Sequence, residues 1–156
     1  MDTLFILGAK YLFIIPVLWL GFLFYQSSPK DRKSIFIFSL LSFSLALIVS
    51  KLLGQIYFNP RPFVVGNFKP LIDHAPDNGF PSDHALLVGA LASVVTIYYK
   101  KYQIWFWLIA ILVAISRVYV GVHHSIDVLA SLVITGISAL IIKKVLDSKK
   151  DATIIK

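Results

Sequence analysis

The sequence is 156 residues long, with 58% hydrophobic and 15% charged residues, a net charge of +7 and a mean hydropathy of +0.80. Soluble domains are closer to half apolar and a quarter charged, so this composition excludes an ordinary soluble protein and indicates a membrane protein. The sequence has no cysteine, which excludes disulfides and thiolate metal sites.

Five apolar segments approach or reach the length of about 20 residues that a helix needs to cross a bilayer. They run from Leu4 to Tyr25, from Ile35 to Tyr57, from His84 to Tyr99, from Ile104 to Val122 and from Ile126 to Val145. The third segment is the shortest. The sequence therefore predicts an all-α fold, a polytopic membrane helix bundle with about five transmembrane helices, forming one domain over residues 1–156.

One connection differs from the others in length and composition. The link from Phe58 to Asp83 contains five of the seven prolines. Proline at this density is incompatible with the interior of a helix and indicates an ordered loop. A loop of this length in so small a membrane protein is a candidate functional element.

The distribution of basic residues predicts the topology. If every apolar segment crosses the bilayer, the side opposite the long loop collects most of the cations: Lys30, Arg32, Lys33, Lys100, Lys101, Lys143, Lys144, Lys149, Lys150 and Lys156. The positive-inside rule makes that side cytoplasmic. We therefore expect a multi-pass protein of the cell membrane, with the loop and the N-terminus outside and the C-terminus in the cytoplasm. The basic charge is then a topology signal, and nucleic-acid binding is not expected.

Ionisable residues gather at the outward face, where each is costly to place and is therefore a functional candidate. They come from three separate segments: Arg61, His84, Arg117, His123, His124 and Asp127. Each segment also has an ordinary structural interpretation. Residues 59–62 resemble a helix stop, residues 81–84 a helix N-cap, and Arg117 with Asp127 an ion pair between helices. His74 and His124 are expected to be loop or interfacial histidines.

Taken together, these segments indicate phosphoryl chemistry. Arg61 and Arg117 supply planar guanidinium groups that match phosphate oxygens, and Ser82 adds a hydroxyl beside the free amides of a helix N-terminus. Both arginines and Ser82 are therefore candidate phosphate ligands.

A histidine nucleophile is predicted next to them. His123 and Asp127 are four residues apart, so on a helical turn the carboxylate can orient the ring and leave the other nitrogen free to attack. Gly121 allows the chain to break between Arg117 and His123, which one continuous helix would place on different faces. His84, from another segment, is positioned to protonate the departing oxygen.

Three motifs in this region resemble those of the type 2 phosphatidic acid phosphatase superfamily, which also includes the vanadium haloperoxidases. The third motif (Ser-Arg, five residues, His, three residues, Asp) is complete from Ser116 to Asp127. The second, usually Pro-Ser-Gly-His, is Pro81-Ser-Asp-His84. The first, usually Lys, six residues, Arg-Pro, keeps Arg61-Pro62 only. Members usually have six membrane spans, whereas this sequence shows five. The haloperoxidase relatives are soluble, so the high hydropathy of this sequence excludes a haloperoxidase.

The resemblance implies a role for each motif residue. His123 would form a phosphohistidine supported by Asp127, and His84 would act first as acid and then as base. The phosphoryl oxygens would be bound by Arg61, Arg117 and Ser82, with no metal or other cofactor. Gly54 stands where the family has lysine, and Lys51, one helical turn earlier, is the candidate to replace it. Asp83 replaces the glycine of the second motif.

The motif Pro-Ser-Asp-His, preceded by Gly-Phe, is similar to the motif of the bacitracin-resistance branch. Members of that branch hydrolyse undecaprenyl diphosphate, the lipid carrier of bacterial cell-wall synthesis. A membrane lipid phosphate is thus the expected substrate. Phosphatidic acid, phosphatidylglycerol phosphate and lipid A stay open as alternatives, as does a protein that binds or transports a lipid phosphate without turnover. The sequence does not predict an oligomeric state.

Overall fold

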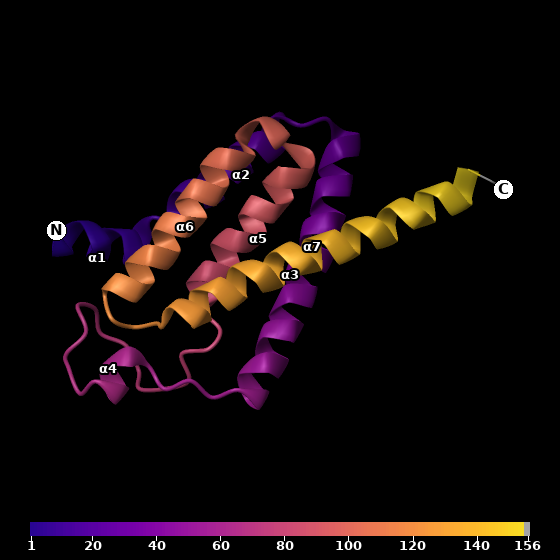
Figure 1. Cartoon of the computed structure of the whole chain (residues 1–156). Helices are drawn as coiled ribbons and strands as arrows, with labels where there is room; N and C mark the ends of the chain where they lie inside the picture. The colour runs from indigo at the N-terminus through magenta and orange to yellow at the C-terminus, as the bar shows by residue number, and fades with distance from the viewer. Residues whose placement is uncertain (155–156) are drawn as a thin grey trace.

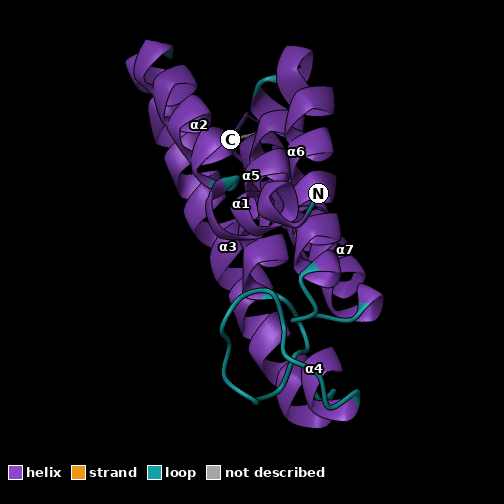
Figure 2. Ribbon diagram, turned by 90° about the vertical axis from the view of Figure 1, so that its left-hand side faces the viewer, coloured by secondary structure: helices purple, strands orange, loops and turns teal. Residues whose placement is uncertain are grey.

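The computed structural model describes residues 1–154, with the side chains of residues 1–149. Within this range the secondary structure is helical, apart from one isolated antiparallel bridge between Pro60 and Asn78. The helices form a bundle with a long loop at one end (Figures 1 and 2). They are α1 (Asp2–Tyr11), α2 (Ile14–Gln26), α3 (Pro29–Ile56), α4 (Pro62–Val65), α5 (Asp83–Tyr98), the 3-10 turn η1 (Lys100–Tyr102), α6 (Gln103–Tyr119) and α7 (Ser125–Ile154).

The predicted all-α membrane bundle is confirmed. Among the described residues, three helical segments are long and apolar enough to cross a membrane: Pro29–Ile56, Lys100–Tyr119 and Ser125–Lys149. The pair α1–α2 makes a fourth if it is one broken span. Helix α5 is apolar but only 16 residues long, in agreement with the short third segment of the sequence.

The first apolar segment, predicted as one span from Leu4 to Tyr25, consists of two helices. Helices α1 and α2 meet at Leu12 and Phe13 with a bend of 41°. Pro16 explains the break, because proline has no N–H to donate to the carbonyl of Leu12, four residues earlier, and its ring clashes with that carbonyl.

Helix α3 begins earlier than the expected Ile35. Ser28 caps it by accepting a hydrogen bond from the backbone N–H of Asp31 at 3.2 Å, and Pro29 occupies the first helical position. The polar stretch before the apolar segment is therefore helical, because its capping residues stabilise the first turn.

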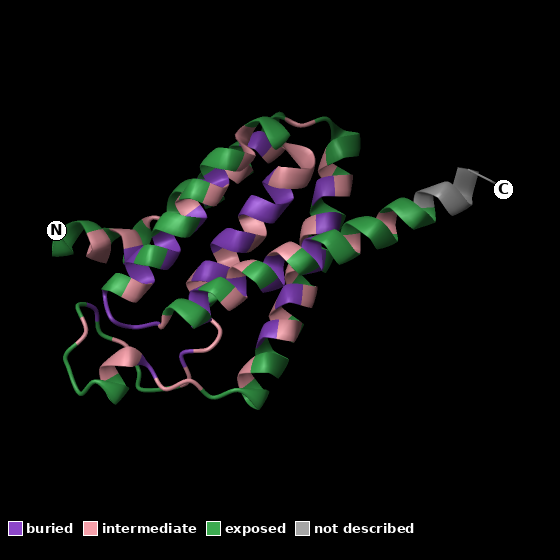
Figure 3. Ribbon diagram, in the orientation of Figure 1, coloured by how far each residue is buried: buried purple, intermediate pink, exposed green. Residues whose placement is uncertain are grey.

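Helix α5 forms the centre of the bundle and packs against α3, α6 and α7. Figure 3 shows α5 mostly buried, whereas the outer faces of the surrounding helices are exposed. Those outer faces are apolar; examples are Leu40 on α3, Ile104 on α6 and Leu140 on α7. A contiguous apolar exterior of this kind is what a lipid environment requires.

Four helix ends and the long loop lie together at one end of the bundle (Figure 1). These are the end of α3, the start of α5, the end of α6 and the start of α7. Helix α1 supports this end, since Phe5 stacks on Tyr119 at 3.8 Å and the Tyr119 hydroxyl donates to Asp2 at 3.0 Å. The three predicted motif segments are therefore brought to the same end of the fold.

Candidate active site

Asn78 organises the long loop. Its side-chain oxygen accepts hydrogen bonds from the backbone N–H of Asn59 and Phe80, at 2.9 and 3.0 Å. Its amide nitrogen donates to the carbonyls of Gly54 and Tyr57, at 2.8 and 3.1 Å. One amide thus uses both of its donors and both acceptor positions to hold the loop against the end of α3.

The turn between α6 and α7 brings Arg117 and His123 together. Gly121 has φ +83°, a left-handed conformation that side chains disfavour, and a Cβ there would lie 2.7 Å from the ring of Phe68. The predicted break at Gly121 is confirmed. The loop also reaches this turn through a hydrogen bond of 3.0 Å from the N–H of Leu71 to the carbonyl of Val120.

His123 is buried at this turn, with 3% of its surface exposed. Its Nδ1 lies 2.9 Å from the carbonyl oxygen of Gly79, which can only accept, so Nδ1 carries the ring proton. Its Nε2 faces two guanidinium groups, Arg61 Nη1 at 3.4 Å and Arg117 Nη2 at 3.5 Å, which can only donate. The contacts of both nitrogens therefore indicate the same tautomer, in which Nδ1 carries the proton and Nε2 has a free electron pair.

Asp127 is fully buried next to the ring. Its Oδ2 lies 3.5 Å from His123 Nδ1 and accepts from the backbone N–H of His124 at 2.8 Å. Its Oδ1 accepts from the side-chain amide of Asn59 at 2.7 Å. The predicted His123–Asp127 pair is present, but the nearer acceptor for Nδ1 is the Gly79 carbonyl, so the ring is oriented by two groups.

Arg61 and Arg117 are both buried, at 5% and 3% exposure. Arg61 donates to the carbonyl of Val122 at 2.8 Å and to Asp77 at 2.7 Å. Arg117 has a different environment, since its Nε is buried without a partner. Arg61 is therefore held in place by protein groups, whereas Arg117 keeps donor capacity for a ligand.

Ser82 is the N-cap residue of α5, as predicted, but its hydroxyl makes no capping hydrogen bond. Of the buried side-chain nitrogen and oxygen atoms described, only Ser82 Oγ and Arg117 Nε have no partner. Unpaired buried polar atoms are costly and call for an explanation. Both belong to three of the four predicted phosphate ligands, Arg61, Ser82 and Arg117, which we call the anion-binding cluster.

The other two predicted site residues differ in placement. His84 lies half-buried in the first turn of α5, with its ring edge-on to Phe13 at 5.5 Å. Lys51 is exposed on α3, and no contact in the described residues joins it to the anion-binding cluster. At Gly54 a Cβ would lie 3.0 Å from the Phe80 carbonyl, so the loop occupies the space beside this glycine. A phosphate-binding role of Lys51 stays a prediction.

Several residues that build the site were not predicted from the sequence. Asn59 and Asn78 act through amide hydrogen bonds, and Asp77 pairs with Arg61. His74, expected to be an ordinary loop residue, lies with its ring 6.2 Å from that of His123. The signal available in the sequence was the cluster of polar residues from Asp73 to Asn78 within an otherwise apolar chain.

The electrostatic environment lowers the pKa of His123 below its ordinary value. Burial disfavours the charged ring, and the hydrogen bond to Asp127 opposes this, while the charges of Arg117 and Arg61 reinforce the lowering. The ring is therefore neutral at pH 7, as a nucleophile must be. Asp77 has a lowered pKa because its hydrogen bond to Arg61 and the charge of that group outweigh the effect of burial.

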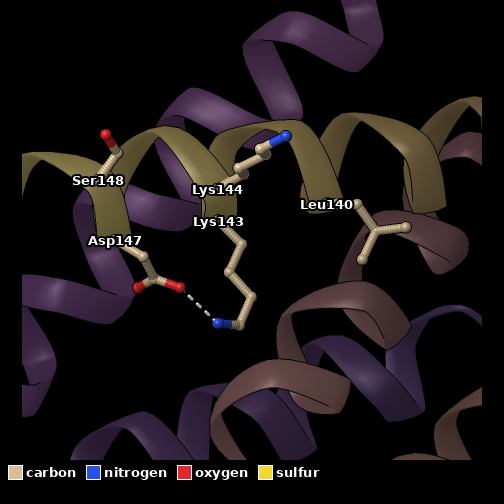
Figure 4. Close-up of a pocket in the computed structure, with 5 residues that line it drawn as sticks. All are labelled: Leu140, Lys143, Lys144, Asp147 and Ser148. Carbon is tan, nitrogen blue, oxygen red and sulfur yellow. Dashed lines mark hydrogen bonds and ion pairs between the residues drawn. The ribbon is translucent and has the colours of Figure 1, made fainter.

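Elsewhere the described residues offer weaker candidates. A shallow hollow on α7 is lined by Leu140, Lys143, Lys144, Asp147 and Ser148 (Figure 4). Lys143 forms an ion pair of 2.6 Å with Asp147 on the same helix, and both side chains are half exposed. No group of three or more His, Asp or Glu side chains suited to a metal ion occurs in the part of the chain that the structure describes. The site around His123 is therefore the principal candidate.

Known proteins are similar to this chain in sequence and in fold. Bacitracin transport permease protein BcrC of Bacillus licheniformis is 34% identical over 136 residues, which cover 86% of this chain and 66% of that protein. Undecaprenyl-diphosphatase BcrC of Bacillus subtilis is 32% identical over 136 residues, covering 86% of this chain and 69% of the relative. The chain thus spans about two thirds of the length of these relatives.

The crystal structure of Aquifex aeolicus LpxE has a similar fold, with a TM-score of 0.71 and 26% identity, over 92% of this chain and 85% of that one. The sequence matches the PAP2 superfamily over residues 33–151, which include the ends of α3 and α6 and the starts of α5 and α7. The chain is therefore an integral membrane protein that belongs to the PAP2 superfamily.

Proposed function

We propose that this protein is a lipid phosphatase that hydrolyses undecaprenyl diphosphate to undecaprenyl phosphate and phosphate, through a phosphohistidine at His123. One observation carries the proposal. The electron pair of His123 Nε2 faces Arg61 and Arg117, and two atoms of the anion-binding cluster, Arg117 Nε and Ser82 Oγ, are buried without a partner. A nucleophile that faces two arginines, in a site with unpaired buried polar atoms, suits phosphoryl transfer.

In the first step, His123 Nε2 attacks the terminal phosphorus. A nitrogen–phosphorus bond forms, the bond from phosphorus to the bridging oxygen breaks, and the lipid phosphate leaves with the electron pair. The ring becomes positively charged, and Asp127 at 3.5 Å from Nδ1 and the Gly79 carbonyl at 2.9 Å stabilise that charge.

The anion-binding cluster stabilises the negative charge on the transferring group. Arg61 and Arg117 supply fixed positive charges, and Ser82 adds its unpaired hydroxyl at the N-terminus of α5. Because these groups are buried, their interactions with phosphate are stronger than in water.

In the second step, water attacks the phosphohistidine and restores His123. We assign the acid and then the base role to His84, which lies in the same turn of α5 as Ser82 and has a ring free of hydrogen bonds in the described residues. A chelator is expected to leave the reaction unaffected, because the side chains named supply every step.

The substrate assignment is supported by the relative whose name gives this activity, at 32% identity. An apolar groove of about 370 Å³ between α6 and α7 also runs from Ile111 to Ser125, two residues after His123. We assign this groove to the prenyl chain, since one end opens beside the catalytic turn. By the positive-inside rule, the site faces the outside of the cell and the C-terminus the cytoplasm.

A binding or transport function without turnover is the competing proposal, and the name of the other relative includes transport. The tautomer of His123 favours an enzyme, because a protein that only binds phosphate has no need of a buried, oriented and neutral nucleophile.

Phosphate release from undecaprenyl diphosphate and from phosphatidic acid, measured in detergent with EDTA, tests the proposal. We expect release to favour the diphosphate and to fall by about 10⁴-fold or more in His123→Ala. Release that survives this substitution would contradict the nucleophile. A folded protein that releases nothing from either lipid would favour the binding function.

A further inference from the structure

His74 has no place in the mechanism above, although the long loop carries it to the site. Its ring is edge-on to that of His123, with centroids 6.2 Å apart and an interplanar angle of 72°. Its Nδ1 has one weak contact, 3.4 Å to the carbonyl of Ala75, the next residue. The remaining ring nitrogen has no partner among the described residues, so this half-buried histidine has unused hydrogen-bonding capacity.

The surroundings of His74 are those of an anion ligand. Both guanidinium groups contact His123 Nε2, at 3.4 and 3.5 Å, and the His123 ring is next to that of His74. Burial lowers the pKa of His74, and the positive charges of Arg61 and Arg117 lower it further. The contact with Ala75 has the opposite effect, which is smaller than the effects of burial and of Arg61. A negatively charged ligand between these groups would offset the two arginine charges and favour a hydrogen bond from the imidazole.

One phosphoryl group does not need His74. Its three non-bridging oxygens are matched by the three members of the anion-binding cluster, Arg61, Ser82 and Arg117, of which two have unpaired donor atoms. His74, as a fourth ligand on the loop side, can bind a second phosphate when the substrate has one. In a lipid diphosphate this second group is the one attached to the lipid, which is also the leaving group.

We propose that His74 binds the lipid-proximal phosphate of a diphosphate substrate and thereby favours diphosphates over monophosphates. This assignment rests on the proposed function of the site and adds a specificity-determining residue to it. It also gives the long loop a chemical role, since His74 and the Arg61 partner Asp77 belong to the same stretch.

Competition experiments separate the two phosphate positions. The inhibition constants of methylenediphosphonate and of inorganic phosphate are measured against undecaprenyl diphosphate hydrolysis. In His74→Ala we expect the constant for methylenediphosphonate to rise about tenfold, the effect of one lost hydrogen bond to a charged group. The constant for phosphate should change by less than about twofold. His74→Gln, which keeps an N–H donor, should restore part of the difference.

Asp73→Asn is the matched control, because this neighbouring side chain is exposed and has no contact with the anion-binding cluster in the described residues. It should leave the ratio of the two constants unchanged. An equal rise of both constants in His74→Ala, or no rise of either, would overturn the proposal. Wild-type protein that releases no phosphate would instead contradict the proposed function, before any variant is compared.

Discussion

The two nitrogens of His123 have opposite surroundings, and this difference is the basis of the chemistry at the residue scale. Nδ1 faces the Gly79 carbonyl and the Asp127 carboxylate, which accept hydrogen bonds, whereas Nε2 faces two arginines, which donate them. The ring is thereby held neutral and correctly oriented without a bound substrate. Electrostatic preorganisation of this kind needs no rearrangement during the reaction.

Replacing Asp127 by Asn tests this arrangement through the pH dependence of kcat/KM. Protonated His123 cannot attack, so the rate falls as pH drops through the pKa of His123, which burial lowers from its ordinary value and Asp127 partly restores. Asp127→Asn should shift this acid limb to lower pH, because a group that favours the charged ring is lost. The rate on the plateau should fall by about 10²-fold.

The reference is the pH profile of kcat/KM for the wild-type protein on the same substrate. Ionisation of the substrate affects both profiles equally and therefore cancels from the comparison. An unchanged rate with an unchanged acid limb in Asp127→Asn would refute the orienting role of the carboxylate.

At the scale of elements, the loop depends on Asn78. Asn78→Ala removes four hydrogen bonds to backbone groups of α3 and the loop. We expect a loss of about 1–3 kcal/mol in stability, because backbone groups lose their partners. We also expect lower kcat/KM, since Gly79 follows Asn78 directly and holds His123. Thermal unfolding and phosphate release measure the two effects.

Asn67→Gly is the control for this prediction. Asn67 is an exposed loop residue with φ +48°, a conformation that glycine adopts readily, and its side chain makes no hydrogen bond in the described residues. Stability and activity should stay close to wild type. An Asn78→Ala protein as stable and active as this control would show that the loop is held by other contacts.

The elements differ in how far the sequence predicts them. Hydropathy predicts the apolar segments, and spacing predicts the residues around His123, because lipid burial and phosphate chemistry restrict the residue types directly. The bend before Pro16 was missed, since hydropathy does not register one lost backbone hydrogen bond. The Gly79 carbonyl was also missed, because a backbone acceptor can belong to any residue and becomes visible only when the loop is folded.

For the whole molecule, the central question is which side of the membrane the site faces. The chain lacks cysteine, so single cysteines can be introduced without background. Lys69→Cys in the loop and Ser148→Cys near the end of α7 are both at exposed positions. We expect an impermeant maleimide to label the first in intact cells and the second only after the membrane is opened, as the positive-inside rule requires.

Labelling of both cysteines from one side would refute the predicted topology. Labelling in the reverse order would keep the bundle and place the site in the cytoplasm. Neither result depends on enzymatic activity, so topology is tested independently of the proposed reaction.

The phosphohistidine is the most direct test of the account as a whole. In His84→Gln, hydrolysis of the intermediate should slow more than its formation, because a lipid phosphate leaves readily without an acid whereas water needs a base. We would mix this variant with undecaprenyl diphosphate, quench in alkali and locate the phosphate by mass spectrometry of peptides. Phosphate on His123 is the predicted result. Turnover with phosphate on another residue, or with no phosphorylated protein under these conditions, would contradict the account.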